Sequence, residues 1–207
     1  AHLRSVIKEH WGFDRFRPLQ ERAIATVLDG RDSVVVVPTG GGKSLCYQAP
    51  AAMRRDGLTV VISPLIALMK DQVDQIKKKG IACAYINSSL SQKERKQAYK
   101  NLAANKYKIL FVTPERFQKE EFLEAIAQIQ VSLLAIDEAH CISDWGHDFR
   151  PQYRLIDRIV RNLPDNLRLL ATTATANDRV MYDLEIVLGP NITTLRGDLN
   201  RPSLYLQ

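Results

Sequence analysis

Short apolar runs alternate with amphipathic stretches along the whole chain. The runs are rich in Val, Ile and Leu and mostly uninterrupted, which is typical of strands buried on both faces of a sheet. They cover residues 33–37, 59–63, 82–86, 108–112, 132–137 and 168–174. Helical apolar spacing marks residues 18–29, 65–79, 92–103, 119–129, 151–161 and 177–188. This alternation predicts an α/β fold, a doubly wound and mostly parallel sheet with helices on both faces.

Composition narrows the class of protein only slightly. The 207 residues are 45% hydrophobic, which suits one soluble domain with a sizeable core. No run of about 18 apolar residues occurs, and the chain starts in a helix-like pattern without a charged-then-apolar leader. We therefore expect neither a membrane span nor a signal peptide. The net charge of +6 favours a polyanionic partner, but many basic domains bind no nucleic acid.

The three cysteines give a separate indication of compartment. Cys46, Cys83 and Cys141 are too few and too far apart for a disulfide framework or a zinc cluster. Their pattern indicates a reducing compartment.

The segment VVVVPTGGGKS, residues 34–44, has the order strand, glycine-rich loop and helix start. Glycines let backbone amides point at phosphate oxygens, and the helix N-terminus adds its positive end. Lys43 would reach the β- and γ-phosphates of ATP, and the Ser44 hydroxyl would bind Mg²⁺. The strict phosphate-loop pattern has glycine where this chain has Val37, so a glycine-rich turn with a chance Lys-Ser is the alternative. The residues expected to contact the nucleotide here are Thr39, Gly40, Gly41, Gly42, Lys43 and Ser44.

Two carboxylates follow the apolar run at residues 132–137. Ligands of open α/β sheets bind at the carboxyl ends of the strands, where this run and the glycine loop both finish. Asp137 would hold Mg²⁺ through its water shell, and Glu138 would orient and deprotonate the attacking water. The alternative is a solvated acidic turn. We interpret His140 as a link between the phosphate site and neighbouring loops, so the candidate catalytic residues are Lys43, Asp137, Glu138 and His140.

Several motifs together resemble a known group of proteins. PTGGGKS (38–44), DEAH (137–140) and ATTAT (171–175) resemble motifs I, II and III of superfamily 2 helicases, which tolerate the departure at Val37. The subgroup that the chain resembles is the RecQ family of DNA helicases. The segments that carry this second resemblance are WGFDRFRPLQ (11–20), SPLIALMKDQV (63–73), TPER (113–116) and CISDWGHDFRPQY (141–153).

The resemblance implies a RecA-like lobe of a P-loop NTPase, with ATP and Mg²⁺ as cofactors. It also implies an ATP-dependent helicase that moves 3′ to 5′ on DNA in recombination and repair. Gln20 would read the adenine edge, with Phe13 and Arg17 stacking on the base. By residue type alone, Phe13 could equally be core and Gln20 a surface helix residue.

Other motifs of the resemblance line a path for single-stranded DNA. The hydroxyls of Ser63 and Thr113, and the helix starts after Pro64 and Pro114, are suited to phosphate oxygens. Plain helix capping is the alternative at these positions. ATTAT resembles the motif that joins hydrolysis to movement; Thr173 and Thr175 could otherwise be turn residues.

The segment after the acidic box resembles the family's aromatic-rich loop, which senses single-stranded DNA. Trp145 offers a flat face on which bases of any sequence can stack. Phe149 and Arg150 are the other DNA-binding candidates, Gly146 would give the loop freedom, and His147, Asp148 and Arg150 could change partners as the loop moves. The alternative is that Trp145 and Phe149 are core aromatics.

The domain organisation follows from the same resemblance. Residues 1–197 would form the first RecA-like lobe, the helicase ATP-binding domain, and residues 198–207 a connection toward a second RecA-like lobe. Expected partners are single-stranded and partly duplex DNA and the second lobe, with no membrane and no obligate dimer, so a monomer. The isolated lobe would be nearly inactive.

Three points stay open in the sequence. A non-catalytic module that binds nucleotide and DNA is one alternative function, and an RNA helicase lobe is another. The location would be the cytoplasm, at the nucleoid, in a bacterium, or the nucleus in a eukaryote.

Overall fold

A seven-stranded parallel sheet forms the centre of the protein. The computed structural model describes residues 2–12, 16–37, 42–54, 57–146, 148–164, 167–174 and 177–197. The strands are β1 (Ser33–Val36), β2 (Leu58–Ile62), β3 (Cys83–Ile86), β4 (Ile109–Val112), β5 (Val131–Ile136), β6 (Arg168–Thr173) and β7 (Thr193–Arg196). They lie in the order β3-β4-β2-β5-β6-β1-β7, and every neighbouring pair is parallel. The predicted α/β fold with a doubly wound parallel sheet is confirmed.

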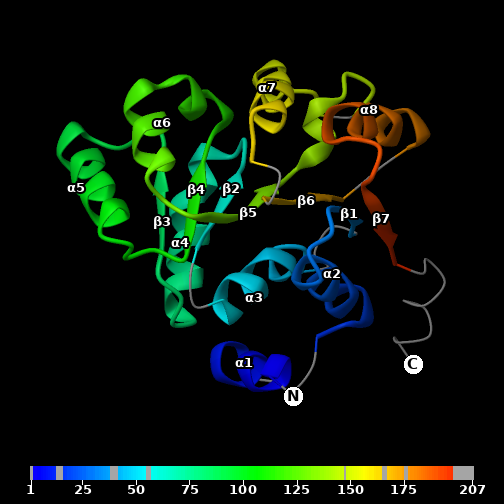
Figure 1. Ribbon diagram of the computed structural model, residues 1–207, viewed down its shortest axis with the longest axis horizontal. Coiled ribbons are helices and arrows are strands. Elements are labelled where there is room, and N and C mark those ends of the chain that lie inside the picture. Colours follow the sequence, from blue (N-terminus) through cyan, green and yellow to red (C-terminus); the bar gives the residue numbers. More distant parts are fainter. Residues whose placement is uncertain are drawn as a thin grey trace.

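Helices connect the strands in the predicted positions (Figure 1). They are α1 (His2–Trp11), α2 (Pro18–Leu28), α3 (Leu45–Met53), α4 (Ile66–Lys78), α5 (Gln92–Ala103), α6 (Glu120–Ala127), α7 (Leu155–Arg161) and α8 (Asp178–Leu188). Short 3₁₀ turns are η1 (Pro114–Gln118), η2 (Ala139–Ile142) and η3 (Pro151–Arg154). The helix predicted at 151–161 is therefore split into η3 and α7. No described helix is long and apolar enough to cross a membrane.

The edge strand β7 was missed by the sequence pattern. It has four residues, of which only Leu195 is buried, and it pairs with β1 alone. A strand on the sheet edge has no second neighbour, so it lacks the continuous apolar run that marks the central strands.

The two faces of the sheet carry different sets of helices. One core packs side chains of α5, α6, α7 and α8 against one face, and a second packs α2, α3 and α4 against the other. Figure 1 shows α6, α7 and α8 above the sheet, α5 to its left beside β3, and α2 and α3 below it. A third small cluster joins α1 to α2 and α3 through Ile7, Phe16, Ile24 and Ala49. Successive strand residues alternate between the two cores, as Leu133 and Leu134 do in β5.

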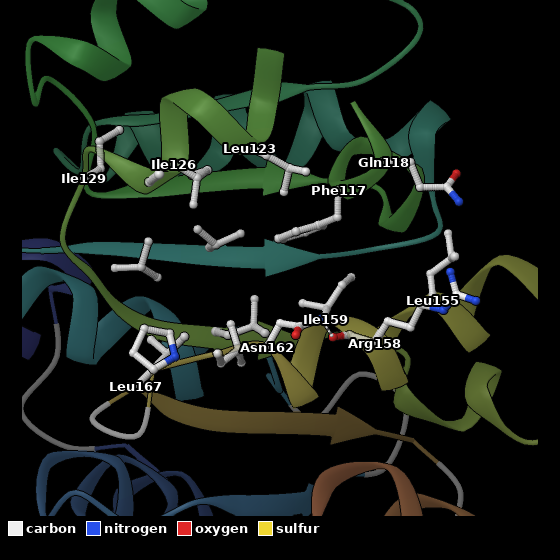
Figure 2. A pocket seen from close by; sticks show the side chains of 16 residues that line it. Phe117, Gln118, Leu123, Ile126, Ile129, Leu155, Arg158, Ile159, Asn162 and Leu167 are labelled. Atoms are coloured by element: carbon white, nitrogen blue, oxygen red, sulfur yellow. Dashed lines mark hydrogen bonds between the residues drawn. The ribbon is translucent and has the colours of Figure 1, made fainter. Parts of the chain in front are cut away.

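An apolar groove of about 580 Å³ lies between α6 and α7. The strand β2 sits between β4 and β5, but the helices that flank β2 in the chain, α3 and α4, pack on the opposite face. The face over β2 and β5 is consequently not fully covered. Figure 2 shows Leu123 and Ile126 of α6 opposite Ile159 of α7, with Val60 of β2 and Leu134 of β5 among the other residues that line the groove. The groove is lined by none of the predicted site residues.

Candidate functional site

The predicted phosphate loop and the acidic box meet where β1 and β5 end. Gly42 has φ +72°, a conformation that L side chains rarely adopt. A Cβ at this position would lie 2.4 Å from Nε2 of Gln20, which itself donates to the Gly42 carbonyl at 3.2 Å. Both the backbone conformation and the close approach of Gln20 therefore require glycine here.

Lys43 lies between the two predicted carboxylates. Its Nζ is 3.4 Å from Oδ1 of Asp137 and in direct contact with Oε1 of Glu138. Asp137 is almost fully buried, whereas Lys43 and Glu138 are partly accessible. The three residues predicted to act on phosphate, metal and water thus form one charged cluster at the carboxyl end of the sheet.

Hydrogen bonds hold both the carboxylate and the backbone carbonyl of Asp137. Its Oδ1 accepts hydrogen bonds from the Thr172 hydroxyl at 2.9 Å and from the Glu138 amide at 3.0 Å. The hydroxyl of Tyr153 donates to the Asp137 carbonyl at 2.7 Å. Burial, followed by the negative charge of Asp137, raises the pKa of Tyr153 well above its usual value, so this hydroxyl remains a donor. These contacts fix the orientation of Asp137.

Glu138 adopts a left-handed backbone conformation, with φ 53° and ψ 45°. A non-glycine residue in this region is uncommon and costs conformational energy, and such residues concentrate at functional sites. Oε2 of Glu138 is 3.3 Å from Nε2 of His140, and Nδ1 of His140 is 3.0 Å from the Thr173 hydroxyl. His140 therefore links Glu138 to the end of β6, and its predicted role as a link to the neighbouring loops stays a prediction.

Two adjacent threonines connect the acidic box to opposite faces of the sheet. Thr172 bonds to Asp137, and Thr173 bonds to His140. Because successive strand residues point to opposite faces, the two hydroxyls extend to different sides of β6. Thr172 thereby joins the side that carries α3 and Lys43, and Thr173 joins the side that carries η2 and α8.

The described adenine-site candidates lie beside the phosphate loop. The side chain of Gln20 is buried, its Oε1 accepts from the Arg17 amide at 2.9 Å, and its Nε2 reaches Gly42. Arg17 is exposed. The amide of Gln20 thus holds the loop while it faces the site, and its contact with adenine stays a prediction.

The hydroxyls predicted to bind DNA phosphates require a correction. Ser63 and Thr113 are buried, as is Pro64, and the Ser63 hydroxyl accepts from the Leu65 amide at 3.3 Å. The Ser63 side chain is fully buried, so its hydroxyl cannot reach a phosphate at the surface of this lobe. Thr113 keeps 5% of its surface accessible, and DNA binding by its hydroxyl and by the backbone amides at the starts of α4 and η1 stays a prediction.

The aromatic loop after the acidic box lies at the surface. Trp145 is 61% exposed and Phe149 is 36% exposed, so the alternative that Trp145 is a core aromatic is wrong. Arg150 is paired with Asp148 at 3.4 Å. Gly146 does not supply the predicted freedom: an added Cβ would lie 2.7 Å from the His140 carbonyl oxygen, so this glycine permits close packing.

Some predicted residues lie outside the described part of the chain, and some contacting residues were missed by the sequence. The first group is Phe13, Thr39, Gly40, Gly41, His147, Thr175 and residues 198–207. The second group includes Thr172 and Tyr153, which hold Asp137. Thr172 lies inside the ATTAT segment, so its motif was noticed but its own hydroxyl was not. Tyr153 ends the quoted segment 141–153, but nothing in that segment shows that its hydroxyl bonds to Asp137, because this partner is reached only through the fold.

His140, Cys141 and Asp148 bring potential metal-ligand atoms within 4.8 Å of one another. Both ring nitrogens of His140 are already paired, with Glu138 and Thr173. Burial, and next the nearby Asp148 carboxylate, raises the pKa of the Cys141 thiol to about 12. Because a thiol binds metal as the thiolate, these groups do not favour a metal ion.

Comparison with known proteins agrees with the motifs. A family model described as DEAD/DEAH box helicase matches residues 17–184. The ATP-dependent DNA helicase RecQ of Bacillus subtilis is 48% identical over 181 residues, which are 87% of this chain and 30% of that protein. RecQ of Haemophilus influenzae is 44% identical over 201 residues, 97% of this chain and 32% of that protein. The resemblance to RecQ helicases is confirmed, and the chain spans about a third of the length of these relatives.

Solved structures share the fold. The DUF1998 helicase MrfA bound to DNA has a TM-score of 0.74 and 19% identity, over 95% of this chain and 29% of that one. A hypothetical ATP-dependent RNA helicase from Sulfolobus tokodaii has a TM-score of 0.69 and 20% identity, over 95% of this chain and 56% of that one. At these identities the likeness establishes the RecA-like helicase fold alone.

Proposed function

Because the chain belongs to the DEAD/DEAH box helicase family, we propose that it is the N-terminal motor lobe of a RecQ-type, ATP-dependent DNA helicase. The observation that carries this proposal is the cluster of Lys43, Asp137 and Glu138 at the carboxyl ends of β1 and β5. It joins the phosphate-binding lysine to both carboxylates of the acidic box. The parent protein would move 3′ to 5′ along DNA and serve recombination and repair.

Lys43 and Glu138 have separate tasks in this proposal. The phosphate oxygens of ATP compete with Glu138 for the Nζ of Lys43, since both are anionic partners of one ammonium group. Once Lys43 binds phosphate, the Glu138 carboxylate is released to orient and deprotonate water. The His140 ring holds Oε2 of Glu138 and so limits the positions that this carboxylate can take.

The oxygen atoms at the site fit Mg²⁺, which prefers few carboxylates and keeps several waters. The Ser44 hydroxyl caps no helix amide, and the described contacts of the Asp137 carboxylate all involve Oδ1. Ser44 and Oδ2 of Asp137 would hold the ion. When bound, Mg²⁺ neutralises charge on the β- and γ-phosphates.

A second RecA-like lobe would complete the nucleotide site. Related hydrolases gain about 10³–10⁵ in rate from an arginine that stabilises the transferring phosphoryl group. We therefore expect the lobe alone to bind ATP and single-stranded DNA while hydrolysing ATP very slowly. We propose a monomer located in the cytoplasm or nucleus with the DNA.

Turnover of ATP with and without single-stranded DNA tests this function. In a protein that carries this chain together with its second lobe, DNA should stimulate hydrolysis and Lys43→Ala should abolish it. Hydrolysis by the lobe alone at the rate of the two-lobe protein would contradict the proposal, because the site would then be complete without its partner.

An RNA helicase is the second candidate, because the acidic box is shared with RNA-acting relatives. The exposed Trp145 loop, which resembles the DNA-sensing loop, favours DNA. Parallel ATPase assays with DNA and RNA oligomers of equal length decide between them. Stronger stimulation by RNA would reject the DNA assignment.

A further inference from the structure

The exposed ring of Trp145 contacts a helix to which no function has yet been given. The guanidinium of Arg179, in the first turn of α8, lies 5.3 Å from the centroid of the Trp145 ring. The same guanidinium lies 5.5 Å from the centroid of the Tyr182 ring. Arg179 is thus shared by two aromatic rings that come from different elements.

All three side chains are open to solvent. Trp145 is 61% exposed, Tyr182 is 54% exposed, and Arg179 is 56% exposed. Ile186, one turn further along the same face of α8, is also exposed. Large aromatic side chains usually remove most of their surface from water, so two neighbouring exposed rings bridged by a cation form an unusual surface.

The loop is attached to α8 by a partly buried hydrogen bond of Ser143. The Ser143 hydroxyl, which is buried, donates to Oδ2 of Asp183 at 2.5 Å and accepts from the Trp145 amide at 3.1 Å. Arg179 is also 3.9 Å from Oδ1 of Asp183. These hydrogen bonds fix the backbone of Trp145 relative to α8, and the contacts of Arg179 with both rings join them in one surface.

We propose that Arg179 and Tyr182 extend the single-strand-binding surface of Trp145 onto α8. This inference rests on the proposed function and names further nucleic-acid-binding residues for it. Successive unpaired bases would stack on Trp145 and on Tyr182. Arg179, between them, would lie over a base or pair with a phosphate of the same strand.

The chemistry of the surface selects single-stranded nucleic acid as its ligand. Every base has a flat face, so stacking on aromatic rings is tolerant of sequence. An arginine between the rings adds both a stacking plane and a charge for the backbone. A duplex hides its base faces inside the stack, so duplex DNA of the same length should not use this surface.

The position of α8 gives the surface a route to the nucleotide site. The helix directly follows β6, whose Thr173 hydroxyl bonds to His140. The hydrogen bond from Ser143 to Asp183 connects α8 to the loop that follows the acidic box. Binding of a nucleic-acid strand at the two rings would therefore act on α8 and on the Trp145 loop, which both lie next to the acidic box.

Fluorescence gives a direct readout, because the sequence has two tryptophans, Trp11 and Trp145. In the chain carrying Trp11→Phe, emission reports on Trp145 alone. At low ionic strength a labelled oligothymidylate should bind, raise the anisotropy of the label and quench Trp145.

The decisive variants change α8 and leave the loop intact. Tyr182→Ala should weaken oligothymidylate binding roughly 5- to 100-fold, the range expected for losing one stacked base. Tyr182→Phe keeps the ring and should bind like the parent chain. Arg179→Ala should weaken binding in the same range. Arg179→Lys keeps the positive charge but loses the planar guanidinium, so comparing the two variants distinguishes stacking from electrostatic attraction.

Two controls guard against indirect effects. Leu123→Ala removes an exposed apolar side chain from α6, away from the loop, and should leave binding unchanged. Thermal melting of each α8 variant should stay within a few degrees of the parent, since the side chains are exposed. A large loss of melting temperature in Tyr182→Ala but not Tyr182→Phe would assign Tyr182 a packing role and overturn the inference.

The outcomes separate this inference from the proposed function. Weaker binding by Trp145→Ala with normal binding by Tyr182→Ala would reject the role of α8 and keep that of the loop. Normal binding by both variants would reject DNA binding by the loop as well. A parent chain that does not bind oligothymidylate at low ionic strength would reject both.

Discussion

The two sides of the acidic box differ in how they hold their functional groups. On the side of α3, Lys43, Asp137 and Thr172 form a compact set of charged and hydrogen-bonded atoms, with Asp137 buried. On the side of α8, Trp145, Arg179 and Tyr182 are exposed and meet through ring and cation contacts. The first arrangement suits a small anion that must be held in one geometry. The second suits a flexible polymer that is bound along its length.

Under the proposed function, this difference would separate the chemistry of hydrolysis from the binding of single-stranded DNA within one lobe. Charged groups are most effective where water is excluded, so they lie at the buried strand ends. Stacking tolerates many sequences and needs an open face, so the rings lie outside. His140 contacts both Glu138 and Thr173, so under the proposed function it would couple the two sides.

The largest effect is expected from removing the water-activating carboxylate. Glu138→Gln in a two-lobe protein should lower hydrolysis at least about 100-fold while ATP and Mg²⁺ still bind, because Ser44, Lys43 and Asp137 remain. Single-turnover hydrolysis and nucleotide binding measure the two parts separately. Loss of nucleotide binding would show that Glu138 holds the ligand and does not act on water. Lys70→Gln, at an exposed lysine of α4, is the control for a charge change.

The adjacent threonines can separate the two sides. Thr172→Val removes a hydrogen bond to the Asp137 carboxylate, typically about 1.5–3 kcal/mol, and should lower basal hydrolysis about tenfold or more. Thr173→Val removes a bond of about 1 kcal/mol to His140 and should lower DNA stimulation while basal hydrolysis changes little. ATPase rates with and without DNA measure both. Equal losses of the basal rate in the two variants would mean that basal hydrolysis and DNA stimulation do not depend on different sides of the acidic box.

The attachment of the loop can be weakened at Gly146. Gly146→Ala places a methyl group against the His140 carbonyl oxygen and should destabilise the protein by about 1–3 kcal/mol. Urea unfolding measures this change. Gly197→Ala is a matched control, because among the described residues its added Cβ would meet only the Leu19 side chain, at 3.4 Å. An unchanged free energy of unfolding for Gly146→Ala would indicate that the loop moves freely, as the sequence had suggested.

The last prediction concerns the buried thiols and the dependence of stability on pH. Burial raises the pKa values of Cys46, Cys83 and Cys141 to about 12, above the usual 9.0. The unfolded chain loses these protons near pH 9 and the folded chain keeps them, so stability should fall as pH rises from about 9 toward 12. Below pH 9 the thiols add no pH dependence. Urea unfolding at pH 8 and pH 10 tests the sign, and rapid labelling of the native thiols at pH 8 would contradict their burial.

Much of the fold could be predicted from local pattern. The central strands are buried on both faces, so their apolar runs are continuous and their positions agree with those observed. The edge strand β7 lacks this signal because it has one neighbour and little burial. A helix was predicted at 151–161, and the structure has helical turns there, but they are split into η3 and α7. Tyr153, which bonds to Asp137, lies in η3.

The candidate site likewise has a part that could be predicted from local motifs and a part that could not. Lys43, Ser44, Asp137 and Glu138 were readable from sequence, because phosphate loops and acidic boxes are contiguous segments whose backbone geometry depends on residue type. Ser63 and Thr113 were assigned as hydroxyl contacts, and their burial could not be read from the motif. Residues 198–207 and the domain boundary near 197 stay predictions.

The sequence by itself determined the positions of the central strands, most of the helices between them, and the phosphate and acidic motifs. Only the tertiary structure decided which residues 30 or more positions apart become partners. Thr172 with Asp137, His140 with Thr173, Ser143 with Asp183 and Trp145 with Arg179 are such pairs. The physical reason is that local pattern records burial and backbone preference, whereas a contact between β5, β6 and α8 depends on the register of parallel strands and on the face that each side chain takes.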